Sequence, residues 1–292
     1  METRTDYGRV NGHLLGIAMK EVVRRALSAI RNERFSFSQR EKTGYDGESA
    51  DLVTTADGKA QEIYLRSLRE CFPNIGVIAE EENLSIEAAP PTSDLYFTVD
   101  PLDGTKAFAR RQSTGIGTML ALINESEVLG AFVGDVMTQE VYGYRPGSSK
   151  VHRISEFEVS ERLKIDPTRQ AADQYILLRE RPETHSTGMG EVIDAFKGLH
   201  VGGGSIGTEA ARLWKGEVGA MLLPPSFETP WDTAPILGIS RALGLQFYIL
   251  TERKLRPFAP PFTEGPVWRE EEVLVLHESR VEEIESLLDR AR

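Results

Sequence analysis

The chain has 292 residues, of which 40% are hydrophobic, and its 34 basic and 45 acidic residues give a net charge of −11. This length is enough for one large or two modest domains with a substantial core. The acids are spread along the whole chain, so the sequence shows no basic face for a nucleic-acid polymer. The single cysteine, Cys71, excludes an internal disulfide framework and favours a reducing compartment. We expect Cys71 to be a small buried residue on a helix.

The first ten residues, METRTDYGRV, are polar and lack the apolar centre of a signal peptide. No apolar run in the sequence is long enough to span a bilayer. These two features predict a soluble cytoplasmic protein that does not act at a membrane.

The first half of the chain predicts two helices, an arm and a sheet. Residues 14–30 have apolar side chains at helical spacing, which indicates an amphipathic helix. Segment 35–47 alternates in polarity and ends in GYDG, which favours a hairpin or an extended arm. A second helical pattern follows Thr54 and Thr55 and stops at Pro73. Short apolar runs then predict strands of an antiparallel or mixed sheet at 75–79, 95–99, 118–123, 128–136 and 140–144.

A turn near residue 147 and a polar stretch up to Arg169 divide the chain into predicted halves, 1–150 and 151–292. The second half alternates strands and helices, which predicts a mostly parallel sheet flanked by helices. The proline-rich segment 256–266 is expected to be an ordered surface loop. Its predicted strands are 175–178, 218–223, 245–250 and 271–277, and its helices lie near 190–197, from 205, from 231 and at the C-terminal end.

The stretch FTVDPLDGTKAF ends an apolar strand in two acids, Asp100 and Asp103. Pro101 fixes its own φ and favours a turn, so the two carboxylates and the Leu102 carbonyl can face one point. In open α/β sheets, ligands gather beyond the carboxyl ends of strands. The alternative is a solvent-facing turn, because Asp-Pro and Asp-Gly are common turn pairs.

The residues that follow these acids can approach a phosphate. Gly104 lets the backbone come close to a ligand, and the N–H groups of Gly104 and Thr105 can bind an anion if a helix starts here. Several acids in one pocket repel one another unless a cation neutralises them. Hard oxygen ligands of this kind suit Mg²⁺.

Three other stretches place acids at the ends of predicted elements. IGVIAEEEN ends a strand in three glutamates that begin at Glu80, TPWDTAP carries Asp232 at a helix start, and LVTTAD carries Asp57. The alternatives are a charged surface loop for the glutamates and helix capping for both aspartates.

Together, DLVTTAD, AEE, DPLDGT and WDTA resemble the signature of the inositol monophosphatase superfamily, which includes the 3′-phosphoadenosine 5′-phosphate phosphatases. The motifs stand in the family's order, and the resemblance covers nearly the whole chain. It implies an α/β fold, the layered αβαβα sandwich of the sugar phosphatase type. It also implies Mg²⁺-dependent hydrolysis of a small phosphate ester by a water that the metal activates.

The resemblance further implies a ligand set for two or three Mg²⁺ ions per site. Glu80, Asp100 and the Leu102 carbonyl would hold the first ion, and Asp100, Asp103 and Asp232 would hold the second. Most of these ligands lie in the half 1–150, whereas the WD motif and the substrate side lie in 151–292.

Catalytic and phosphate-binding roles also follow from the resemblance. Thr105 and Asp57 would orient and deprotonate the attacking water, with help from Glu80, and Gly104 would contact the phosphate. DGTKAF, with Lys106, is more similar to the DGTKEF of the 3′-phosphoadenosine 5′-phosphate phosphatases, although Ala107 departs from it. A lysine near the phosphate favours a substrate with more negative charge.

The substrate side is expected in HVGGGSIGTEAARLW, which is similar to the family's SxGT helix start. Gly204, Ser205 and Thr208 are its candidate substrate-binding residues, and Ser205 can also cap the helix. Inositol monophosphatases have a glutamate before WD that binds inositol hydroxyls. No acid stands at the matching place here, and the nearby Glu228 is an uncertain counterpart, which puts inositol specificity in question.

Pro235 departs from the alanine that usually follows WDxA in the family. If Asp232 caps the helix, Pro235 falls in the first turn and costs no helical hydrogen bond. The expected substrate is inositol phosphate or 3′-phosphoadenosine 5′-phosphate. Alternatives are fructose 1,6-bisphosphate, histidinol phosphate or a non-catalytic phosphate-binding role, and relatives of this kind are often homodimers.

Overall fold

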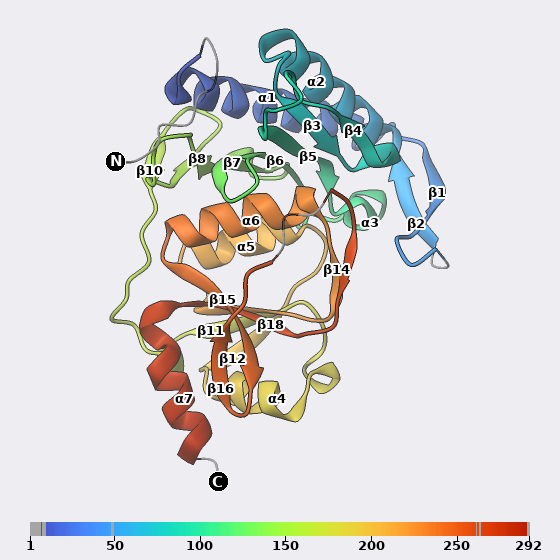
Figure 1. The fold of residues 1–292 in the computed structure, drawn as a ribbon. Coiled ribbons are helices and arrows are strands. Elements are labelled where there is room, and N and C mark those ends of the chain that lie inside the picture. The colour runs from blue at the N-terminus through green and yellow to red at the C-terminus, as the bar shows by residue number, and fades with distance from the viewer. Residues whose placement is uncertain (1–6, 8–9, 48–49, 261, 263, 291–292) are drawn as a thin grey trace.

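The computed structural model describes residues 7, 10–47, 50–260, 262 and 264–290. Its elements stack in layers (Figure 1). Helices α1 and α2 cover the outer face of a first sheet, α5 and α6 lie between this sheet and a second one, and α4 and α7 cover the far face of the second sheet. The predicted αβαβα sandwich is therefore confirmed. Apolar side chains fill the spaces between the layers.

The two outer helices follow from amphipathic sequences with N-caps. Helix α1, Gly12–Glu33, buries one face against the sheet and begins at Asn11, whose side chain accepts the Leu14 N–H. Helix α2, Thr55–Cys71, begins at the N-cap Thr54. The predicted arm is a two-stranded hairpin of β1, Gln39–Thr43, and β2, Ala50–Thr54.

The first sheet has the order β10-β9-β8-β7-β6-β5-β3-β4. Only β3 and β5 pair in parallel, so the predicted mixed sheet is confirmed. Its strands are β3 Gly76–Ala79, β4 Leu84–Ile86, β5 Tyr96–Asp103, β6 Gly117–Ile123, β7 Val128–Asp135, β8 Glu140–Tyr144, β9 His152–Ile154 and β10 Ser160–Arg162. The short helix α3, Thr105–Ala109, follows β5 directly.

The division of the chain at residue 150 stays a prediction. Strands β9 and β10 come after that residue and join the first sheet, and α6 packs against β6 and β7 of the same sheet.

The second sheet has the order β12-β11-β13-β18-β15-β16, and the prediction that it is mostly parallel is wrong. Only the pairs β11–β12 and β11–β13 are parallel. Strand β18 runs antiparallel to both of its neighbours, and β15 turns back directly into β16 as a hairpin. Its strands are β11 Tyr175–Leu178, β12 Gly198–Val201, β13 Ala220–Leu223, β15 Leu245–Thr251, β16 Lys254–Pro257 and β18 Val273–His277.

Besides short 3-10 turns, the described part of the chain has four further α-helices and a small ribbon. The helices are α4 Thr187–Asp194, α5 Ile206–Trp214, α6 Pro230–Ala242 and α7 Val281–Arg290. Strands β14, Ser226–Glu228, and β17, Val267–Arg269, form the ribbon. The predicted surface loop 256–266 includes positions 261 and 263, which lie outside the described residues.

Two local expectations are wrong. Helix α6 begins at Pro230 after the N-cap Thr229, so Pro235 lies inside the helix, where it cannot donate to the Trp231 carbonyl. Cys71 is exposed, because α2 ends there and the chain leaves helical geometry at Phe72, whose ring is buried instead.

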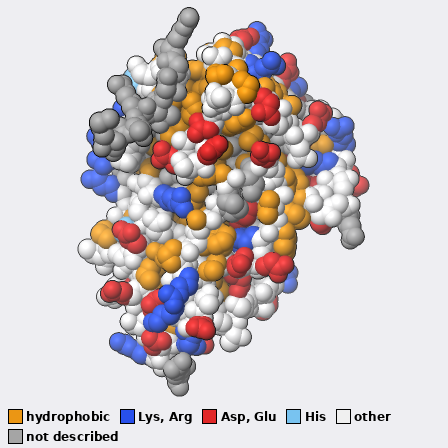
Figure 2. All heavy atoms as spheres, in the orientation of Figure 1, with side chains coloured by type: hydrophobic (Ala, Val, Ile, Leu, Met, Phe, Trp, Pro, Cys, Tyr) orange, Lys and Arg blue, Asp and Glu red, His pale blue; other side chains and the backbone are white. Residues whose placement is uncertain are grey.

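The surface shows two further properties. On the face in Figure 2, acidic and basic side chains are interspersed and neither kind forms a continuous area. None of the described helices combines the length and the apolar character that crossing a membrane requires.

Candidate active site

Two acids of the site come from an irregular stretch of strand β5. Residues three apart in a regular strand face opposite sides of the sheet. The pairing of β5 with β6, however, shifts register between Asp100 and Asp103. Pro101 has no N–H for the ladder, which explains why the irregularity falls here. Asp100 and Asp103 are both buried, so the alternative of a solvent-facing turn is wrong.

The third acid, Asp232, comes from the first turn of α6. One carboxylate oxygen from each of Asp100, Asp103 and Asp232 lies within 4.8 Å of the other two. Thr229 occupies the N-cap position of α6, and its hydroxyl lies 2.6 Å from Oδ2 of Asp232. Asp232 is therefore not the N-cap residue. Asp232 stands far from Asp100 and Asp103 in sequence, and the structure brings it beside them.

The charged forms of the three carboxylates are unfavourable when no cation lies between them. Burial, followed by the charges of Glu80 and Asp232, raises the pKa of Asp100 well above its usual value. Burial and the charge of Asp103 raise the pKa of Asp232 to about 8. Burial also raises the pKa of Asp103, although hydrogen bonds from Ser205 and Gly207 oppose the effect. Among the described residues, Oδ1 of Asp100 is buried without a hydrogen-bond partner.

These observations fit a divalent cation. A cluster of buried carboxylates with raised pKa values is stabilised when a cation neutralises it. The donors are hard oxygens, which Mg²⁺ prefers. The orphaned Oδ1 of Asp100 gives such an ion a ligand atom that no protein group uses.

Helix α5 holds Asp103 in place. The Asp103 carboxylate accepts three hydrogen bonds at the start of this helix, from the Ser205 hydroxyl at 2.5 Å, the Gly207 N–H at 2.8 Å and the Ile206 N–H at 3.0 Å. Ser205 is also the N-cap of α5, because its Oγ accepts the Thr208 N–H at 2.9 Å. The predicted capping by Ser205 is confirmed. Neither Ser205 nor Thr208 lines the cleft described below, and their contact with substrate stays a prediction.

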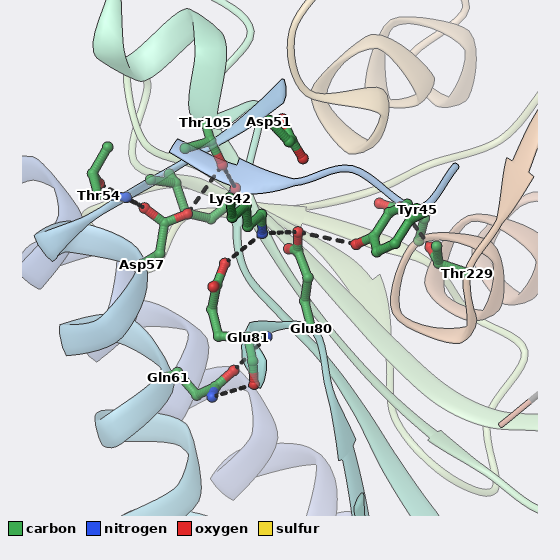
Figure 3. Close-up of polar contacts among 12 residues, drawn as sticks. Lys42, Tyr45, Asp51, Thr54, Asp57, Gln61, Glu80, Glu81, Thr105 and Thr229 are labelled. Carbon is green, nitrogen blue, oxygen red and sulfur yellow. Dashed lines mark hydrogen bonds and ion pairs between the residues drawn. The ribbon is translucent and has the colours of Figure 1, made fainter. Parts of the chain in front are cut away.

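Asp57 and Thr105 also meet, as Figure 3 shows. Asp57 is fully buried, and its Oδ2 accepts the Thr54 N–H at 2.7 Å, which confirms the capping interpretation. Its Oδ1 lies 3.0 Å from the Thr105 hydroxyl, which also lies 3.1 Å from the Leu102 carbonyl. Burial raises the pKa of Asp57 to about 6, despite the hydrogen bonds from Thr54 and Thr105.

Glu80 lines the same cleft as the three aspartates, and its side chain contacts the arm (Figure 3). Its Oε1 is 3.0 Å from Nζ of Lys42 and 3.2 Å from the hydroxyl of Tyr45. Lys42 Nζ also lies 3.0 Å from Oε1 of Glu81, which is buried. The glutamate run is therefore not simply a charged surface loop. The ring of Tyr45 packs against Phe227 of β14 and Trp231 of α6.

The acids form one wall of a cleft of about 1020 Å³. Gly104 lies at this wall with φ of +90°, and a Cβ there would lie 2.3 Å from the Gly115 carbonyl oxygen. Lys106 is exposed and pairs with Asp51 at 3.2 Å. Gly204 also lines the cleft, and its carbonyl accepts a hydrogen bond from Arg179 at 2.8 Å. Other cleft residues include Tyr45, Glu80, Leu102, Arg110, Glu180, Glu209 and Arg212.

Several of these residues were not predicted from the sequence. Lys42 and Tyr45 stand in an arm whose docking depends on distant contacts, and no motif marks Arg179. Glu209 and Arg212 lie in the stretch expected on the substrate side, but the sequence did not single them out. The carboxylate of Glu228 is occupied, because Nε of Arg269 lies 2.6 Å from it and the Thr233 hydroxyl also contacts it.

The model of the inositol monophosphatase family matches residues 13–285. The chain belongs to the inositol monophosphatase family. Inositol monophosphatase 1 of Rattus norvegicus is 27% identical over 116 residues, which cover 40% of this chain and 42% of that protein. The 3′(2′),5′-bisphosphate nucleotidase CysQ of Salmonella typhimurium is 35% identical over 97 residues, 31% of this chain and 36% of that protein.

The aligned segments thus span less than half the length of these curated relatives. The likeness in fold extends further than these two pairwise alignments do. The solved structure of an IMPase/NADP phosphatase, complexed with Mg²⁺ and phosphate, superposes with a TM-score of 0.68. It is 17% identical, and the superposition covers 94% of this chain and 95% of that one.

Proposed function

We propose that the chain is a Mg²⁺-dependent phosphomonoesterase that hydrolyses a small phosphate ester. The observation that carries this proposal is the group of Asp100 and Asp103, which are buried, and Asp232, which is half-buried, at a cleft beside Gly104. Membership of the inositol monophosphatase family supports the same reaction class.

The proposed metal ligands are Glu80, Asp100, the Leu102 carbonyl, Asp103 and Asp232, for two or three Mg²⁺ ions. When bound, Mg²⁺ supplies Lewis-acid chemistry, which lowers the pKa of an attacking water and neutralises phosphate charge. Lys42 and Tyr45 both contact Oε1 of Glu80, so Oε2 can serve as the ligand atom while these contacts persist.

The protein contributes positioning and proton transfer. Asp57 and Thr105 orient the attacking water, and Asp57 accepts its proton, for which a pKa of about 6 is suitable. Gly104 has no side chain, so the phosphate can approach the backbone there. Phosphoryl transfer depends mainly on positioning and charge neutralisation, so this scheme needs no protein nucleophile.

The proposed substrate is either a phosphate ester with more than one negatively charged group or the phosphate ester of a polyol. Lys106, Arg110, Arg179 and Arg212 all line the cleft, so they can neutralise a second anionic group. Inositol phosphate and 3′-phosphoadenosine 5′-phosphate remain the proposed substrates, with Lys106, Gly204, Ser205 and Thr208 on the substrate side. A cytoplasmic location and a homodimer are also proposals that follow from the sequence and the resemblance.

Phosphate release with Mg²⁺, and with EDTA as the control, tests this proposal. The panel is inositol 1-phosphate, 3′-phosphoadenosine 5′-phosphate, fructose 1,6-bisphosphate, histidinol phosphate and p-nitrophenyl phosphate. The proposal predicts Mg²⁺-dependent release with a preference for one of the first four esters. No release from any of them by folded protein would overturn it, and Mg²⁺ binding without release would favour a non-catalytic phosphate-binding role.

A further inference from the structure

Glu209 lies on the cleft side of α5 and has no part in the function proposed above. Its side chain lines the cleft, although only 9% of the residue is exposed. It stands two residues after Gly207, whose N–H binds Asp103. The same helix therefore fixes a proposed metal ligand and, two residues after Gly207, presents a carboxylate to the cleft.

Arg212 donates a hydrogen bond to one oxygen of the Glu209 carboxylate. Oε2 of Glu209 lies 3.2 Å from the Arg212 guanidinium, whose Nε in turn lies 3.2 Å from Glu217. Within the described part of the chain, Oε1 of Glu209 has no hydrogen bond and is not fully buried, and the residue lines the cleft. One acceptor atom of a side chain with a fixed orientation is thus available to a ligand.

Gly202 makes room for the carboxylate. A Cβ at Gly202 would lie 2.6 Å from both Cδ and Oε2 of Glu209, and the three atoms nearest to it all belong to Glu209. Gly202 also lines the cleft, and its backbone is not in the left-handed region. An alanine at this position would therefore collide first with the Glu209 carboxylate and displace it.

We infer that Glu209 is a specificity-determining residue that accepts a hydrogen bond from a hydroxyl group of the ester's alcohol. This inference rests on the proposed function and specifies the substrate class, a phosphate ester of a hydroxylated alcohol such as a polyol or a ribose. A carboxylate oxygen accepts O–H hydrogen bonds and repels a second phosphate. The nearby Arg179 and Arg212 disfavour a cationic alcohol such as an amine.

The alternative is that Glu209 and Arg212 are only an intrahelical ion pair. Such a pair has a small effect on stability and does not affect which substrate the enzyme prefers. The two interpretations differ in whether a Glu209 variant distinguishes esters with hydroxyl groups from esters without them.

The experiment compares two substrate pairs that differ only in hydroxyl groups. One pair is inositol 1-phosphate and cyclohexyl phosphate, and the other is adenosine 3′-phosphate and 2′-deoxyadenosine 3′-phosphate. For Glu209→Ala, kcat/KM on the hydroxylated member of at least one pair should fall about 10- to 100-fold, the loss expected for a hydrogen bond to a charged group. Its value on the partner ester and on p-nitrophenyl phosphate should change less than about twofold, and Glu209→Gln should lie between.

Gly202→Ala provides a second, independent variant. It should reproduce the loss of Glu209→Ala, and the double variant should lose no more than either single one, because both changes act through the same carboxylate. Glu21→Gln is the matched control, because it breaks a similar acid–arginine pair on α1, far from the cleft in sequence and fold.

Equal losses on both members of each pair, or no loss on any, would overturn the inference and leave the proposed function intact. No Mg²⁺-dependent release by the wild type from any ester, p-nitrophenyl phosphate included, would overturn both proposals.

Discussion

The hydroxyl of Thr105 lies 3.0 Å from Oδ1 of Asp57, although the two residues are 48 positions apart. Asp57 is fixed by the start of α2, where it completes a capping box with Thr54. Thr105 is fixed by the end of β5 and the start of α3. A helix start and a strand end thus position the pair that we propose to activate the attacking water.

Asp57→Asn should change how stability depends on pH. Burial raises the pKa of Asp57 from 3.8 to about 6. The folded chain therefore binds this proton more tightly than the unfolded chain does. Protonation of Asp57 therefore stabilises the fold. This contribution to the free energy of unfolding is complete below about pH 4 and disappears as the pH rises through about 6, a loss on the order of 2–3 kcal/mol.

Urea unfolding of the wild type and Asp57→Asn between about pH 4 and pH 7 measures this effect. The variant keeps a side-chain oxygen that can accept the Thr54 N–H, and its stability should decline less over the range. Glu62→Gln, on the exposed side of α2, should behave like the wild type. Parallel curves for the wild type and Asp57→Asn would contradict the prediction.

Asp100→Asn should abolish activity and stabilise the metal-free protein. The substitution removes one acid from a group whose members raise one another's pKa, so unfolding in EDTA should cost about 1–3 kcal/mol more. Phosphate release should fall at least about 100-fold, because a metal ligand is lost. Asp94→Asn, at an exposed position before the same strand, is the control. Wild-type turnover in Asp100→Asn would refute the ligand assignment.

Ser205→Ala should weaken Mg²⁺ binding as well as the fold. The buried hydroxyl both caps α5 and donates to Asp103, so its loss should lower stability by about 1–3 kcal/mol. Mg²⁺ affinity should fall about 10- to 100-fold because Asp103 loses a partner that orients it. Ser186→Ala removes the cap of α4 and should leave Mg²⁺ affinity unchanged. Calorimetric Mg²⁺ titration distinguishes the two, and equal affinities would contradict the role of Ser205.

Tyr45→Ala should release the arm from the cleft. The arm strand β1 is largely exposed, and the Tyr45 ring contacts Phe227 and Trp231. Without the ring, the hairpin loses packing worth about 0.5–1.5 kcal/mol per aromatic contact, so limited proteolysis should cut residues 39–47 faster. Tyr45→Phe keeps the ring and loses the hydroxyl bond to Glu80, and it should be cut at nearly the wild-type rate. If both variants are cut alike, the ring does not hold the arm.

Local sequence patterns predicted the elements well and their pairing less well. Helical periodicity located α1 and α2, and apolar runs located β3, β6 and β7. The alternation of strands and helices did not predict that β18 pairs antiparallel with β13 and β15, because packing between distant segments decides this pairing. The position of Pro235 was misjudged because α6 begins at Pro230, before the aspartate that was expected to cap it.

The candidate site shows the same limits. The resemblance to the family implied that Asp100, Asp103 and Asp232 hold one ion, and the structure brings the three together. The contact of Lys42 with Glu80 was not predicted, because a lysine in an alternating strand has no distinguishing pattern. Glu209 resembles any acid in the first turns of a helix until the position of Gly202 is known.

The most direct test of the account is the initial rate of phosphate release as a function of Mg²⁺ concentration, for the wild type and Asp103→Asn side by side. Asp103 is chosen because it is held by α5 and faces the cleft together with Asp100 and Asp232. The account predicts a saturable Mg²⁺ dependence in the wild type, reversal by EDTA, and a loss of at least about 100-fold in the variant. Release that is independent of Mg²⁺, or equal in the two proteins, would contradict the claim that these carboxylates hold the metal for catalysis.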